Sequence, residues 1–291
     1  MCGIVGYLGT QDAAPILLDG LRRLEYRGYD SAGVSILDGN GGLTTQKETG
    51  KISVLEKTLG SSLPKGSCGI AHTRWATHGA PNQVNAHPHT SGDGSIALVH
   101  NGIIENAEVL RRQLEKLGYE FRSETDTEVV VHLIDEAFKE NEKLEDAVAA
   151  ALLQVEGAYG IAVVSSRDPQ KIVAARNGSP LLLGIGRNGE YLVGSDAAAL
   201  VTHTRDVVYL ADGDVAVMNG GRYWTFHLER GAVSRPIDRV TWELGAIEKG
   251  GYPHFMLKEI FEQPATLRDV TRGRLLPEEG AAKLGGITLP D

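Results

Sequence analysis

The sequence predicts an α+β fold in which antiparallel sheets carry helices on their outer faces. Segments that resemble strands dominate the first hundred residues, helical segments occupy the middle, and strands return afterwards. A parallel, doubly wound sheet would need strict alternation of strand and helix, which this chain does not show. The 291 residues are enough for one large domain or two smaller ones with a sizeable core.

The first part of the chain alternates short apolar runs with two segments of helical periodicity. "GIVGYLG" at 3–9 is apolar and flanked by glycines, as expected for a buried strand. The segment 12–28 has apolar residues at helical spacing, begins with an aspartate and ends at Gly28. The predicted elements, in order, are a strand at 3–9, a helix at 12–28, two strands within 31–49, a helix at 50–60, a strand opening 68–94 and a strand at 95–104.

The second part begins with helical patterns and continues with short strands separated by turn dipeptides such as Asn-Gly and Asp-Gly. The predicted helices are 106–117, 126–139 and 143–154, and the predicted strands are 158–165, 171–176, 180–185, 190–194, 206–210, 213–218 and 222–228. One G-x-G-x-x-G pattern occurs at 184–189, but a strand follows it. Because a dinucleotide fingerprint must open a helix, this pattern is interpreted as a turn.

Composition excludes several classes of protein. The chain is 42% hydrophobic, which is ordinary for a globular protein, and its net charge of -9 argues against nucleic-acid binding. No segment approaches the ~20 apolar residues of a membrane span, and no apolar signal opens the chain. Two cysteines are too few for a secreted disulfide scaffold of this length. We therefore expect a cytoplasmic protein that does not bind a membrane.

A thiol lies one residue from the start of the chain, at Cys2. If Met1 is removed, Cys2 carries a free α-amine whose reference pKa, about 7.7–8.0, lies just below the ~8.5 of a thiol. The amine can then accept the thiol proton, so that nucleophile and base belong to one residue. The alternative is a small apolar cysteine buried in the first strand.

Further candidates follow from side chains that suit the stabilisation of an oxyanion. Asn101 offers an amide donor, and Gly102 offers a backbone N–H that no side chain blocks. The alternative interpretation of this Asn-Gly pair is a tight turn, although no partner strand precedes it closely.

The loop "HTRWATHG" at 72–79 is dense in functional groups. Arg74 can pair with a carboxylate, Thr77 and His78 add hydrogen-bonding capacity, and Trp75 offers an apolar lid. The alternative is that Arg74 and Trp75 simply cover the edge of a core.

Carboxylates at Glu124, Asp126 and Glu128 precede or open a helix. The helix dipole favours acidic residues there, although one of them could instead bind an ammonium group. Five histidines between 72 and 100 suggest a metal site, but short ligand spacings are absent. We predict no metal and no cofactor.

Together these segments resemble the glutaminase domain of class II (N-terminal nucleophile) glutamine amidotransferases, and within that class the glutamine–fructose-6-phosphate aminotransferases. The matching segments, in order, are "MCGIVGYLG", "LEYRGYDSAG" (24–33), "GIAHTRWATHG" (69–79), "NAHPH" (85–89), "HNGIIEN" (100–106), "SETDTEV" (123–129), "GAYG" (157–160) and "MLKEIFEQP" (256–264). The resemblance implies the four-layer αββα sandwich of N-terminal nucleophile hydrolases.

The resemblance also implies roles for residues. Cys2 would attack the side-chain amide of L-glutamine, and Asn101 and Gly102 would form the oxyanion hole. Arg74 would bind the substrate carboxylate and Asp126 the substrate ammonium group, and Thr77 and His78 would complete that pocket. Trp75 would close the pocket and gate the passage of ammonia, and Arg27 would support the site. Gly3 is expected to leave room for the substrate amide.

The resemblance further implies that 1–240 is the glutaminase domain and that 241–291 is a linker towards an absent sugar-phosphate isomerase region. Fructose 6-phosphate would act only through that absent region, and full-length relatives would be homodimers. Two alternatives stay open. The chain could belong to another class II amidotransferase, such as the phosphoribosyl-pyrophosphate enzyme, or it could be a glutamine-binding module without catalysis.

Overall fold

The computed structural model describes residues 2–38, 41–60, 63–76, 79–241, 250–271, 275–276 and 281–282. The chain divides into two compact units, Met1–Thr241 and Trp242–Asp291. The first unit contains both large sheets and all of the candidate site residues that the structure describes.

One sheet is built around the N-terminal strand β1 (Gly3–Leu8). All of its pairings are antiparallel, and β1 lies between β4 (Cys68–Arg74) and β10 (Tyr191–Gly194). The sheet has the order β15-β11-β9-β10-β1-β4-β2-β3. Its other strands are β2 (Ser31–Leu37), β3 (Leu43–Thr49), β9 (Leu182–Ile185), β11 (Asp206–Tyr209) and β15 (Asp238–Arg239). The pairing of β1 on both sides fixes the position of the N-terminal segment at the centre of a sheet.

The second sheet is also antiparallel and has the order β14-β13-β12-β8-β7-β6-β5. Its longest pair joins β6 (Ile96–Ile104) to β7 (Gly157–Ser165). The remaining strands are β5 (His89–Thr90), β8 (Lys171–Asn177), β12 (Asp214–Asn219), β13 (Arg222–His227) and β14 (Gly231–Val233).

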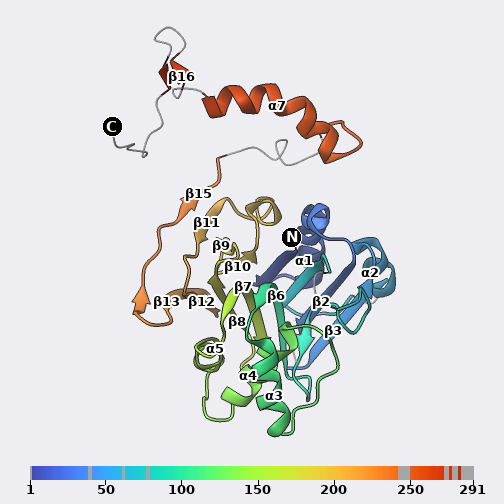
Figure 1. Cartoon of the computed structure of the whole chain (residues 1–291), viewed down its shortest axis with the longest axis vertical. Helices are drawn as coiled ribbons and strands as arrows, with labels where there is room; N and C mark the ends of the chain where they lie inside the picture. Colours follow the sequence, from blue (N-terminus) through green and yellow to red (C-terminus); the bar gives the residue numbers. More distant parts are fainter. Residues whose placement is uncertain are drawn as a thin grey trace. The chain divides into compact units, whose positions relative to one another are not determined.

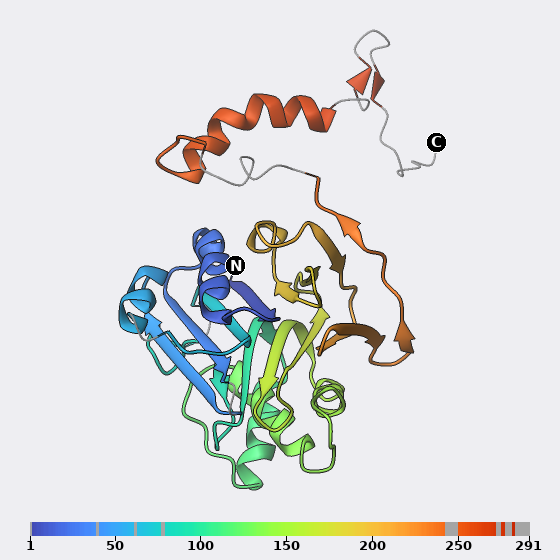
Figure 2. The ribbon, with the colours of Figure 1, turned by 180° about the vertical axis from the view of Figure 1, so that it is seen from behind.

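Helices cover the outer face of each sheet, as Figures 1 and 2 show. Helices α1 (Ala13–Leu24) and α2 (Ile52–Leu59) pack on the first sheet, and α3 (Ala107–Lys116), α4 (Thr127–Ala137) and α5 (Leu144–Leu152) pack on the second. Short 3-10 turns lie at Glu25–Arg27 and Ala197–Ala199. The predicted four-layer αββα sandwich of antiparallel sheets is confirmed.

Side chains of the strands alternate between two cores because successive residues of a strand point to opposite faces. In β6, Ile96 and Leu98 pack under α3–α5, while Ala97 and Val99 belong to the core between the sheets. In β1, Ile4 and Leu8 belong to that inter-sheet core. The same alternation places Asn101 of β6 and His72 of β4 on the inter-sheet side of their strands.

The second unit contains α7 (Phe255–Thr271) and a two-stranded pair, β16 (Leu275–Leu276) with β17 (Ala281–Ala282). Among the residues that the structure describes, no helix combines the length and the apolar character that a membrane crossing needs.

Candidate active site

Cys2 lies where three strands of the two sheets approach one another. The backbone N–H of Trp75, just after β4, donates to the Sγ of Cys2 over 3.2 Å. The side-chain amide Nδ2 of Asn101, in β6, donates to the carbonyl oxygen of Cys2 over 3.1 Å. Cys2 is therefore held by contacts from both sheets, through its sulfur on one side and its backbone carbonyl on the other.

The electrostatics of Cys2 favour the neutral thiol. Burial raises the pKa of the Cys2 thiol, although the Trp75 N–H and the nearby Arg74 charge act in the opposite direction. A thiol in this state needs a base before it can act as a nucleophile, because only the thiolate attacks.

A small polar cavity of about 30 Å³ opens beside Cys2. Arg74 and Asp126 both line it, so it presents one positive and one negative charge. Arg74 is only 3% exposed, and the carboxylate of Asp126 is oriented by the Ile104 N–H over 2.8 Å. The lining residues are Cys2, Arg74, Trp75, His87, His100, Gly102, Thr125, Asp126 and Thr127. This pair of opposite charges matches the carboxylate and ammonium of an α-amino acid.

Gly102 occupies a position that only glycine fits. Its φ is +141°, and a Cβ there would lie 1.9 Å from the carbonyl oxygen of Ala158 in β7. The Asn101-Gly102 pair therefore lies within the β6–β7 ladder, and the alternative of a tight turn is wrong.

A larger cavity of about 400 Å³ meets the polar one at Cys2, Trp75 and Gly102. Arg27 lines this second cavity, where its guanidinium is paired with the carboxylate of Asp196. The lining residues are Cys2, Arg27, Trp75, Asn101, Gly102, Ile103, Glu105, Ala158, Ser179, Pro180 and Ser195. Trp75 is 45% exposed and packs edge-on against Tyr29 at the border of the two cavities.

Four histidines between 72 and 100 are buried close together, and sequence reasoning assigned none of these four to the site: His72, His87, His89 and His100. His72 and His87 stack with ring centroids 4.2 Å apart, and His87 contacts His89 at 4.8 Å. Burial lowers the pKa of His72 to about 3 and that of His87 well below its ordinary value. Among the described residues, no group of three histidine, cysteine or acidic side chains is placed to hold a metal ion. The density of histidines in the sequence was the available signal for this cluster.

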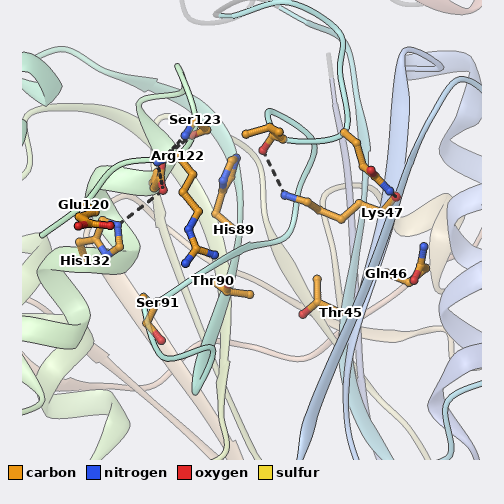
Figure 3. Close-up of a pocket in the computed structure, with 14 residues that line it drawn as sticks. Thr45, Gln46, Lys47, His89, Thr90, Ser91, Glu120, Arg122, Ser123 and His132 are labelled. Carbon is orange, nitrogen blue, oxygen red and sulfur yellow. Dashed lines mark hydrogen bonds and ion pairs between the residues drawn. The ribbon is translucent and has the colours of Figure 1, made fainter.

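A third cavity, of about 340 Å³, lies beyond His89 and contains none of the predicted site residues (Figure 3). Lys47 reaches into it and donates to the carbonyl oxygens of Val84 and Ala86, and burial lowers the pKa of Lys47 to about 8. Ser123 lies on the side of the cavity opposite Lys47, and its backbone N–H and hydroxyl donate to the carboxylate of Glu128. The segment 83–92 therefore contributes part of the cavity wall, and the two hydrogen bonds from Lys47 hold this segment in place.

The structure brings most of the predicted residues together. Cys2, Arg74, Trp75, Gly102 and Asp126 line one cavity. Asn101 contacts Cys2 directly, and Arg27 lines the larger cavity. Thr77 and His78 lie outside the described residues.

The expectation for Gly3 needs correction. A Cβ on Gly3 would lie 2.7 Å from the Cβ of Leu24, so the missing side chain makes room for α1 rather than for a substrate.

Comparison with known proteins relates this geometry to a described family. A glutamine amidotransferase domain model matches residues 72–202. The glutamine–fructose-6-phosphate aminotransferase [isomerizing] of Chlorobaculum tepidum is 54% identical over 99% of this chain, and that of a Thermus thermophilus strain is 51% identical over 98%. The chain carries a glutamine amidotransferase domain. It spans about half the length of these curated relatives, 47% and 46% respectively.

A solved structure supports the fold of this glutamine amidotransferase domain. The glutamine phosphoribosylpyrophosphate amidotransferase from B. subtilis, complexed with ADP and GMP, aligns with a TM-score of 0.68 and 30% identity. The alignment covers 78% of this chain and 49% of the B. subtilis chain. The N-terminal nucleophile sandwich is therefore shared with an amidotransferase that is more distant in sequence.

Proposed function

We propose that this domain hydrolyses L-glutamine to glutamate and ammonia through a γ-glutamyl thioester on Cys2. The observation that carries the proposal is the meeting of a thiol, an amide donor and a cavity with two opposite charges at one point. Arg74 binds the α-carboxylate of glutamine and Asp126 binds its ammonium group, which directs the side-chain amide towards Cys2. Thr77 and His78 complete the same pocket in this proposal, while Trp75 closes it and Arg27 supports the adjoining cavity.

The chemistry begins with the α-amine of Cys2, which becomes available once Met1 is removed. The amine accepts the thiol proton, and the thiolate attacks the side-chain carbonyl carbon of glutamine. The Asn101 amide and the Gly102 N–H donate to the oxyanion that forms. The carbon–nitrogen bond then breaks, and the amine returns its proton to the leaving nitrogen, which departs as ammonia. Water attacks the thioester, releasing glutamate and restoring the thiol.

The proposed destination of the ammonia is a sugar phosphate. In a longer protein that carries a sugar-phosphate isomerase region after the linker 241–291, ammonia and fructose 6-phosphate would give glucosamine 6-phosphate. The support is identity: relatives named as fructose-6-phosphate enzymes reach 54% over nearly the whole chain, whereas the phosphoribosylpyrophosphate relative reaches 30%. The domain would occupy 1–240, and the longer protein would be a homodimer.

We place the protein in the cytoplasm. Both cysteines are free thiols, which suits a reducing compartment. Neither a nucleic acid nor a membrane is a proposed partner.

A comparison of the two cysteines tests the proposal. Glutamate release from glutamine is measured for the wild-type chain, for Cys2→Ala and for Cys68→Ala. Cys68 is a matched control because it is buried, and burial raises its pKa to about 12, which keeps it unreactive. Cys2→Ala is expected to lose at least about a thousandfold in kcat, and Cys68→Ala to keep its activity. Equal glutamate release by wild type and Cys2→Ala would refute the proposal.

A further inference from the structure

We propose that His72 is a positioning residue that locks the amide of Asn101 with its nitrogen towards Cys2, so that this amide donates to the oxyanion. The inference rests on the proposed thioester chemistry and adds to it a residue that touches neither the substrate nor the sulfur. His72 lies on β4, in one of the two inner sheets of the sandwich, and is fully buried.

The tautomer of His72 follows from a backbone carbonyl. The Nε2 of His72 lies 3.1 Å from the carbonyl oxygen of His100, and a carbonyl oxygen can only accept a hydrogen bond. Nε2 must therefore carry the proton. The Nδ1 of His72 has no hydrogen-bond partner among the described residues. A neutral ring with a bare Nδ1 leaves no buried N–H unsatisfied.

The orientation of Asn101 follows from that tautomer. The same Nε2–H lies 3.0 Å from Oδ1 of Asn101. If the amide were flipped, two N–H groups would face each other at His72, and the amide oxygen would face the Cys2 carbonyl oxygen. With Oδ1 held by His72, the Nδ2 of Asn101 donates towards Cys2 over 3.1 Å. His72 thus contacts the oxygen end of the Asn101 amide and thereby directs the nitrogen end, the proposed oxyanion donor, towards Cys2.

The surroundings of His72 suit a fixed, uncharged ring. His72 stacks on His87 with an interplanar angle of 29°, which holds the ring plane. Burial lowers the pKa of His72 to about 3, so the ring stays neutral throughout the pH range of an enzyme assay. His72 therefore acts by geometry, and its proton does not take part in the reaction.

Substitutions separate the donor of His72 from its volume. His72→Gln places an amide N–H near the position of Nε2, whereas His72→Leu fills similar space without a donor. We expect His72→Leu to lower kcat by about 10²–10³-fold, the usual effect of losing one oxyanion donor. KM for glutamine should change little, because Arg74 and Asp126 are untouched. His72→Gln should retain kcat within about tenfold of wild type.

A double-mutant cycle with Asn101→Ala identifies the route of the effect. On the Asn101→Ala background, His72→Leu should cost less than about threefold, because the amide that it positions is gone. The inference is overturned if His72→Leu alone leaves kcat within threefold of wild type. It is also overturned if His72→Leu lowers kcat by about 10²–10³-fold on the Asn101→Ala background as well. These outcomes differ from failure of the proposed function, in which wild type and Cys2→Ala would release glutamate equally.

A measurement on the unaltered protein does not depend on the kinetics of the variants, and it needs only His72→Gln for assignment. In the protein with ¹⁵N-labelled histidine, the His72 resonances, assigned by their loss in His72→Gln, should show a protonated Nε2 and an unprotonated Nδ1. A proton on Nδ1 would overturn the inference.

Discussion

Gly102 has a φ of +141°, which residues with a side chain rarely adopt, and its position in β6 faces the carbonyl oxygen of Ala158. A Cβ at Gly102 would lie 1.9 Å from that oxygen. Contacts of real Cβ atoms are essentially never shorter than 3.0 Å, so Gly102→Ala must separate the two strands by about 1 Å.

The expected cost has two parts. A strained φ costs of order 1–3 kcal/mol, and overpacking between strands costs a further ~1–3 kcal/mol. Together they lower the free energy of unfolding by about 2–6 kcal/mol, a large part of the 5–15 kcal/mol typical of a domain. A displacement of about 1 Å at an oxyanion donor also lowers kcat by about 10²-fold.

Chemical denaturation and glutamate release measure these two effects separately. Gly94→Ala is the matched control, because Gly94 has a φ of +74° but no heavy atom within 4 Å of its would-be Cβ. In Gly94→Ala only the strained φ should lower the free energy of unfolding, by about 1–3 kcal/mol, and kcat should stay unchanged. If Gly102→Ala were as stable and as active as Gly94→Ala, the reasoning from the Ala158 collision would be refuted.

Two further substitutions test carboxylates, one in the candidate site and one in the third cavity. Asp126→Asn keeps an oxygen for the Ile104 N–H but loses the charge, so KM for glutamine should rise about tenfold or more while the unfolding free energy changes by less than about 1 kcal/mol; an unchanged KM would contradict the role of Asp126. Burial raises the pKa of Glu128, but His132 at 3.7 Å and hydrogen bonds from Ser123 outweigh it and lower the pKa to about 2 from the ordinary 4.5. Because the folded pKa is the lower one, Glu128 stabilises the fold above pH ~4.5, and the contribution, on the order of 3 kcal/mol, is lost as the pH falls towards 2. Glu128→Gln should flatten that part of the stability profile, and an identical acid profile for both proteins would show that the carboxylate contributes nothing.

The order of strand and helix patterns along the sequence predicted antiparallel sheets with helices outside, and the family resemblance implied the four-layer sandwich. Every strand predicted between 158 and 228 is present, and the G-x-G-x-x-G at 184–189 joins β9 to β10 as a turn. The two-residue strands β5 and β15 and the three-residue strand β14 were not predicted, because periodicity cannot be measured over so few residues.

Candidate site residues could be predicted from the sequence where the side chain or backbone group itself suits the proposed reaction. Cys2, Asn101 and Asp126 carry groups that suit the proposed reaction, and the structure places them close together. The contacts of Arg27 with Asp196 and of His72 with Asn101 were not predicted. They join residues 169 and 29 positions apart, and only the packing of strands and layers brings such pairs together.

The central claim is that Cys2 is the nucleophile and that it acts from the N-terminus of the chain. The most direct measurement treats the protein with an electrophilic glutamine mimic and maps the modified residue by peptide mass spectrometry. The account predicts a single adduct on the sulfur of Cys2, in an N-terminal peptide that lacks Met1, and protection by excess glutamine. An adduct on Cys68 or another side chain, or labelling of Cys2 in a chain that retains Met1, would contradict it.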